Sequence, residues 1–162
     1  MIEKTLQHHS SYKQVDDSLY VIKQGSAYVM INVVAWGPNK AAVRCWAQLV
    51  KGVDLNLVLA TELLTFNSEL HFGAFAWDAD GAAILFTHTI LGGTTLDPEE
   101  LMATLTDVAL TADEYDDKLM QRYGGQRMRD LLDEEALRRV VDSGPAQRAA
   151  RKGKSKGKGA AS

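Results

Sequence analysis

The first part of the chain has the pattern of consecutive β-strands. Leu19–Lys23, Ala27–Trp36 and Ala41–Val50 are rich in β-branched and aromatic residues, and short turns containing glycine separate them. Strands joined by such short turns pair antiparallel. The pattern therefore predicts a three-stranded antiparallel meander. The spacing of Ile2 and Leu6 predicts a short helix over residues 2–9 ahead of it.

The middle of the chain changes to helical spacing and then returns to strands. Asp54 is predicted to cap a helix that runs to about Leu70, because its side chain can accept from the free N–H groups of the first turn. Ala74–Trp77 and Ala82–Ile90 follow as two strands around the turn Asp78–Gly81. The predicted helix has one apolar stripe, formed by Leu55, Leu59, Leu63, Phe66 and Leu70.

The strongest helix signal begins at Asp97. Asp97 is an N-cap residue, Pro98 has a suitable φ for the first helical position, and Glu100 can complete a capping box. The helix is predicted to reach Tyr123, before a break at Gly124-Gly125, and another helix follows from Gln126 to about Val141. The buried stripe of the long helix is Leu101, Leu105, Val108, Ala112, Tyr115 and Leu119. The order α-β-β-β-α-β-β-α-α predicts an α+β fold with an antiparallel sheet of about five strands.

The predicted strands are apolar on both faces. An antiparallel sheet with helices on one side normally has a polar second face, but here that face is aromatic. A mixture of aromatic residues, Met and Arg is typical of interface cores. The face covers either a partner segment, a second subunit or the chain's own C-terminal helices. Its predicted residues are Tyr28, Met30, Val34, Trp36, Arg44, Trp46, Phe75 and Trp77.

Composition fits one soluble domain. The chain has 162 residues, of which 46% are apolar and 24% are charged. No stretch approaches the roughly 18 uncharged apolar residues of a membrane span, and the start of the chain lacks the apolar region of a secretory signal peptide. The single cysteine, Cys45, excludes a disulfide framework. We predict a reduced, cytoplasmic protein.

The net charge of −3 conceals a division of the chain. Residues 144–162 carry six basic residues and no acidic one, whereas residues 1–143 carry 12 basic and 21 acidic residues, a net charge of −9. Low complexity and the lack of apolar residues predict that 144–162 is a disordered basic tail after a folded domain over 1–143. The basic residues of the tail are Arg148, Arg151, Lys152, Lys154, Lys156 and Lys158.

Residues with catalytic or metal-binding chemistry form no recognisable motif. The four histidines (His8, His9, His71 and His88) lack the spacing of a zinc site. The segment Gly92–Thr95 lacks the lysine and spacing of a phosphate loop. Asp113, Glu114, Asp116 and Asp117 could bind a cation, although a solvated acidic face around Tyr115 is the favoured interpretation. We predict no enzyme, no metal and no cofactor.

Two blocks of sequence resemble a known family. The first is Leu63–Phe75 (LLTFNSELHFGAF), and the second is Leu96–Leu101 followed by Thr111–Asp117 and Gly124-Gly125. They resemble the YbjN-like family, which is similar to type III secretion chaperones of the Tir-chaperone kind. The resemblance extends over roughly residues 15–125. It implies a compact α+β unit with a curved antiparallel sheet, often dimeric, and a chaperone-like or regulatory binding role without catalysis.

These observations give two hypotheses for function. The first is a non-catalytic adaptor or chaperone-like regulator that holds a segment of a partner protein, docked as an added strand or an amphipathic helix. Its surplus apolar surface also predicts a homodimer. The alternative is a nucleic-acid-associated regulatory protein that acts through its basic tail. The acidic body and the absence of aromatic residues in the tail predict only weak, salt-sensitive contact with nucleic acid.

Overall fold

The structure is a computed structural model that describes residues 2–6 and 12–142. The chain divides into two compact units, Met1–Arg129 and Asp130–Ser162. The helices and strands are, in chain order, α1 (Ile2–Leu6), β1 (Tyr12–Gln14), β2 (Leu19–Gln24), β3 (Ala27–Ala35), β4 (Ala41–Lys51), α2 (Leu57–Glu69), β5 (Ala74–Asp78), β6 (Ala83–Leu91), the 3-10 turn η1 (Gly93–Thr95), α3 (Pro98–Tyr123), β7 (Gln126–Arg127) and α4 (Met128–Asp142). The basic tail and residues 7–9 of the predicted first helix lie outside the described residues.

The strands form one open antiparallel sheet in the order β1-β2-β3-β4-β6-β5, and β7 pairs with the end of β4. The predicted α+β class is confirmed, but the sheet has seven strands rather than about five. The two additional strands, β1 and β7, have only three and two residues. Such short, mostly polar segments carry no alternating pattern, because they are too short for one to develop.

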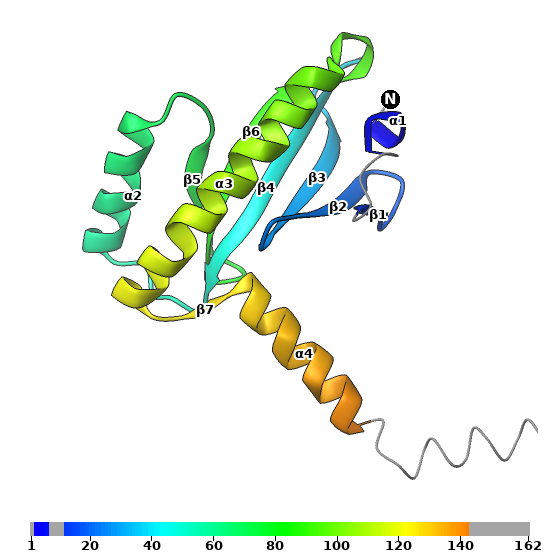
Figure 1. The fold of residues 1–162 in the computed structure, drawn as a ribbon. Helices are drawn as coiled ribbons and strands as arrows, with labels where there is room; N and C mark the ends of the chain where they lie inside the picture. The colour runs from blue at the N-terminus through cyan, green and yellow to red at the C-terminus, as the bar shows by residue number, and fades with distance from the viewer. Residues whose placement is uncertain (1, 7–11, 143–162) are drawn as a thin grey trace, which may run out of the picture. The chain divides into compact units, whose positions relative to one another are not determined.

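One face of the sheet is covered by helices. Figure 1 shows α3 running across the sheet, with α2 beside β5. The predicted stripe of α3 is buried at Leu101, Leu105, Val108, Ala112 and Leu119, and Tyr115 is half-buried. These side chains pack on sheet residues that include Val29, Ile31, Cys45, Ala47 and Phe86. Ile2 and Leu6 of α1 and Leu59 and Leu63 of α2 belong to the same core.

The helix starts follow local capping. Asp97 Oδ1 accepts from the backbone N–H groups of Glu99 (2.7 Å) and Glu100 (3.2 Å), as the sequence predicts. The predicted cap of α2 is wrong, since Asn56 rather than Asp54 accepts from the N–H of Leu59, at 3.0 Å. Asp54 lies two residues too early, and both residue types are equally good caps.

The sequence block Leu63–Phe75 forms the junction between α2 and β5. The Asn67 side chain makes two hydrogen bonds to the backbone of Phe75. Its Oδ1 accepts from the Phe75 N–H (2.6 Å), and its Nδ2 donates to the Phe75 carbonyl (3.2 Å). Gly73 has φ +70°, and a Cβ there would lie 2.5 Å from Cζ of Phe86. The motif is therefore architectural, because it fixes the helix to the edge strand and leaves room for a core aromatic ring.

Candidate functional site

The register of the sheet defines a second face, which we call the open face. Residues opposite one another in register share a face. Met30 pairs with Trp46 and Asn32 with Arg44. The remaining side chains of β3 and β4 on this face are Tyr28, Val34, Ala42 and Gln48. The core helices α1, α2 and α3 pack on the other face, so within Met1–Arg129 none of them covers the open face.

Five of the eight predicted interface residues share this face: Tyr28, Met30, Val34, Arg44 and Trp46. Met30 is the most buried of the five, at 6% exposed. Trp36 lies one residue beyond the end of β3 and is exposed. The Lys40 ammonium lies 5.1 Å from the centre of its ring. The structure therefore brings together a continuous two-strand patch and places Trp36 at its margin.

Phe75 and Trp77 are predicted on the aromatic face, and that prediction is wrong. Phe75 pairs in register with Phe86, which pairs with Ala47 of the core. Phe75 is 5% exposed, and its ring lies 5.0 Å from that of Tyr115. Trp77 also packs against the core. Alternation shows only that two residues share a face, while the pairing with β6 decides which face that is.

The open face combines aromatic surface with polar groups. Trp46 Nε1 donates to Oδ1 of Asn32 at 3.2 Å, so the indole N–H is satisfied within the face. The Lys23 ammonium lies 5.5 Å from the centre of the Tyr28 ring. Arg44 is exposed beside Trp46. Large rings held by polar neighbours, with an exposed guanidinium, have the composition of a protein-binding patch.

A second apolar surface, the outer side of α2, was missed by the sequence reasoning. Leu57, Val58 and Leu64 are 82%, 64% and 69% exposed. Leu55, predicted to be part of the buried stripe, precedes the helix and is exposed. The available signal was that the segment LNLVLATELL has apolar residues outside the predicted stripe, whereas an ordinary surface helix is apolar on one side only.

This second surface borders a groove of about 540 Å³ between α2 and the end of α3. Its polar wall is a small network in which the Glu62 carboxylate accepts from the Arg122 guanidinium at 2.5 Å and from the Tyr123 hydroxyl. Burial and the hydrogen bond to Glu62 raise the pKa of Tyr123. The groove is lined by Leu57, Val58, Thr61, Glu62, Thr65, Phe66, Arg122 and Tyr123.

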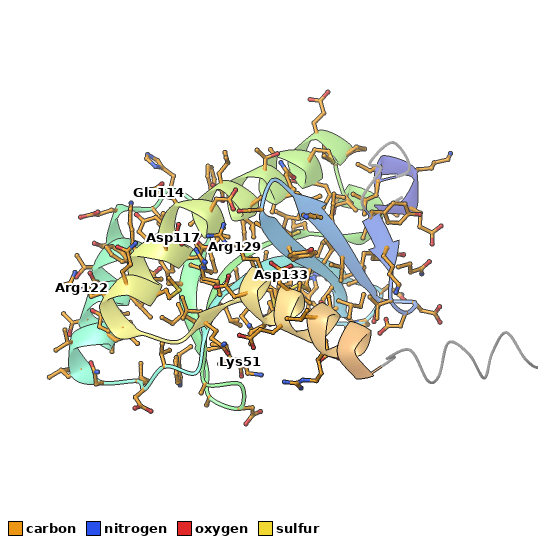
Figure 2. All side chains as sticks on the ribbon, turned by 60° about the horizontal axis from the view of Figure 1, so that its bottom comes forward. Lys51, Glu114, Asp117, Arg122, Arg129 and Asp133 are labelled. Atoms are coloured by element: carbon orange, nitrogen blue, oxygen red, sulfur yellow. The ribbon has the colours of Figure 1, made fainter. Side chains whose placement is uncertain are left out.

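The acidic residues on α3 have separate partners. Asp113 accepts from the Ser26 hydroxyl, and Asp117 pairs with Arg127 and, at 3.2 Å, with Arg129. Figure 2 labels Asp117 and Arg129. Burial raises the pKa of Asp116. Across residues 2–6 and 12–142, no group of three His, Cys, Asp or Glu side chains could hold a metal ion. These contacts join α3 to the turn between β2 and β3 and to the chain around β7, and they support the structural interpretation of the acidic cluster.

The sheet of this α+β unit has one face covered by α1, α2 and α3 and a second face, rich in aromatic residues, that these three helices do not cover. The comparisons place it in a family: the chain belongs to the family described as T3SS (YopN, CesT) and YbjN peptide-binding chaperone 1, whose model matches residues 1–131. The resemblance found in the sequence is thereby confirmed. The family's description as peptide-binding chaperones indicates a protein-binding role.

Solved structures show the same fold. A chain from the crystal structure of the ExsC-ExsE complex matches with a TM-score of 0.51 and 18% identity, over 64% of this chain and 78% of that chain. An uncharacterized protein from Methanothermobacter thermautotrophicus matches with a TM-score of 0.50 and 18% identity, over 76% of this chain and 97% of that chain. No curated protein matches the chain. No helix among the described residues is long and apolar enough to cross a membrane.

Proposed function

We propose that this protein is a chaperone-like adaptor that holds a segment of a partner protein against the open face. The observation that carries the proposal is the patch formed by Tyr28, Met30, Trp46 and Arg44, which the core helices leave uncovered. The peptide-binding family supports it. Aromatic rings bring a large contact area at small cost in conformational entropy, which suits them to anchor a peptide.

The occupant we expect is an apolar segment, bound as an amphipathic helix across the face or as an added strand at a sheet edge. The edges differ in capacity. β1 has only three residues, whereas β5 has five and is supported by α2 through Asn67. An added strand would therefore find longer main-chain pairing at β5.

Site-specific cross-linking tests the proposal whichever protein the partner is. A photoreactive amino acid at Arg44 of the full chain, followed by mass spectrometry, is expected to capture one partner segment repeatedly. The matched control places the same amino acid at Leu110, which is exposed on α3. Identical products at both positions, or none at Arg44 while cells contain abundant protein, would contradict a binding site on the open face.

We further propose that two copies associate through the outer side of α2. Leu57, Val58 and Leu64 present adjacent apolar side chains to solvent, and such patches usually mark interfaces. Light scattering at micromolar concentration is expected to give the dimer mass. Leu64→Glu should give the monomer, whereas Arg44→Glu should leave the dimer intact. A monomeric wild-type chain would refute the dimer, and a monomer produced only by Arg44→Glu would move it to the open face.

The nucleic-acid hypothesis stays a prediction, because the basic residues on which it rests lie outside the described part of the chain. Neutralising the six basic residues of the tail should abolish any salt-sensitive DNA binding if the hypothesis is right.

A further inference from the structure

A small cavity lies between β6 and the first half of α3, on the helix-covered side of the sheet and apart from the open face. Its volume is about 220 Å³, and its walls are formed by Phe72, His88, Glu100, Ala103, Thr104 and Asp107. Ligand pockets for drug-sized molecules are larger, at roughly 300–1,000 Å³. The cavity is therefore of a size to receive one long side chain.

The aromatic wall of the cavity is preformed. The Phe72 ring stacks on the His88 imidazole with centroids 5.6 Å apart and an angle of 11° between the planes. Phe72 is largely exposed although it makes this contact. A stacked pair of flat rings offers a planar surface to a planar cation, and a guanidinium stacks readily on such a surface.

The opposite wall carries negative charge. Glu100 and Asp107 are seven residues apart on α3, which places them on one side of the helix two turns apart. Across residues 2–6 and 12–142, no lysine or arginine pairs with either carboxylate. The walls of the cavity thus hold two carboxylates and one imidazole, and, among the described residues, neither lysine nor arginine lines them.

Polar groups in the cavity lack hydrogen bonds. His88 Nδ1 and Asp107 Oδ2 lie 3.3 Å apart, yet both atoms are buried and neither makes a hydrogen bond. Thr104, which also lines the cavity, is a polar residue that is only 3% exposed. Buried polar atoms are normally paired, so a ligand that donates to the Asp107 carboxylate would supply the hydrogen bond that His88, at ion-pair distance, does not make.

We propose that this cavity binds an arginine side chain of the partner segment. The guanidinium has five donors in a planar fork, which matches two carboxylates and an aromatic wall, and its aliphatic stem can contact Ala103 and Phe72. The proposal rests on the peptide-binding role proposed above, because it names one residue type in the bound segment. It concerns a separate cavity, so it can fail while the open face still binds.

The test uses the full chain and the probe N-acetyl-arginine amide, which has no free termini. Binding is followed by NMR through the Thr104 methyl and His88 ring signals. We expect saturable binding at millimolar concentrations. N-acetyl-citrulline amide has the same shape without the charge and should bind at least about tenfold more weakly, because hydrogen bonds to charged groups are stronger than those between neutral groups. Glu100→Gln and Asp107→Asn should each weaken binding about tenfold.

Glu99→Gln is the matched control, because Glu99 is exposed and adjacent in sequence but does not line the cavity. It should bind the probe as the wild type does. Thermal melting of each variant establishes that it is folded. Equal binding of the arginine and citrulline probes would overturn the proposal. So would binding of methylguanidinium as tight as that of the arginine probe, which would indicate a small-cation site. Loss of the Arg44 cross-link with intact arginine binding would instead remove the open face as the site.

Discussion

The two faces of the sheet are built from neighbouring residues of the same strands, yet they differ in what they contact. On the covered face, Val29, Ala47, Phe86 and Phe75 lie in one row across four strands, and all are buried against helices. The row next to it on the open face contains Met30, Trp46, Thr87 and Ala74, most of which are partly exposed. Neighbouring residues along β3 and β4 therefore alternate between side chains that pack in the core and side chains on the open face.

The polar content of the faces explains why they can have different roles. Among the described residues, the large side chains buried in the core are almost all hydrocarbon. The open face keeps an internal hydrogen bond between Trp46 and Asn32, which orients the indole before any partner arrives. A surface ordered in advance loses less conformational entropy on binding. The covered face should therefore dominate stability, and the open face should dominate affinity.

The largest effect expected from this comparison is at the centre of the covered face. Leu105→Ala removes a fully buried side chain of α3 and should lower the free energy of unfolding by about 2–5 kcal/mol. Leu110→Ala, at an exposed position of the same helix, is the control and should change it by less than about 0.5 kcal/mol. Urea unfolding measures both. Similar losses in the two variants would mean that α3 is not the core helix described above.

A pair of tryptophans compares the faces directly. Trp46→Ala should weaken partner binding by about 2 kcal/mol or more and affect unfolding less than Leu105→Ala does. Trp77→Ala should show the reverse order, with about 2 kcal/mol or more lost from folding and little from binding, because its ring packs on the core. The cross-linked segment from the Arg44 experiment provides the ligand for titration. Loss of stability with intact binding in Trp46→Ala would make the open face a structural one.

The sequence predicts those features of the fold that depend on residues close together along the chain. Alternation over nine or more residues identified β3, β4 and the patch of Tyr28, Met30 and Trp46. The assignment of Phe75 and Trp77 failed because it depends on the pairing of β5 with β6 and of β6 with β4, which only the tertiary structure determines. A local sequence pattern predicts which residues of a strand share a face of the sheet, but it does not predict whether that face is the covered face or the open face.

Two other features lay beyond local patterns for different reasons. Leu55 has the same spacing from Leu59 as a buried helix residue would have, so periodicity alone predicted its burial, although it precedes α2 and is exposed. The cavity that contains His88 and Asp107 brings together residues nineteen positions apart on different elements. The cavity forms where α3 packs across β6, and no sequence motif predicts that packing.

The packing of the covered face also restricts which residue can stand at position 73, where the backbone lies close to the Phe86 ring. Gly73→Ala should destabilise the fold by about 2 kcal/mol, because Gly73 has φ +70° and the new Cβ would lie 2.5 Å from Cζ of Phe86. Gly52→Ala is the control, with φ +77° but no atom within 4 Å of its Cβ, and should cost only about 1 kcal/mol. Thermal or urea unfolding separates them. Equal losses would show that backbone conformation alone, without the contact with Phe86, explains the requirement for glycine.

The smallest effect concerns Cys45, which lies on the covered face opposite His88 in register. Burial raises the pKa of its thiol from 9.0 to about 12. The unfolded chain therefore ionises at lower pH than the folded chain. The stability from keeping the thiol neutral is fully present below pH 9 and is lost as pH rises toward 12. Between pH 8 and 10, the free energy of unfolding should fall by about 1 kcal/mol more in the wild type than in Cys45→Ala.

A thiol reagent at pH 8 should label Cys45 only when denaturant is added. Rapid labelling of the native chain, or identical pH profiles of the two proteins, would place the thiol in contact with solvent and contradict the burial of this row.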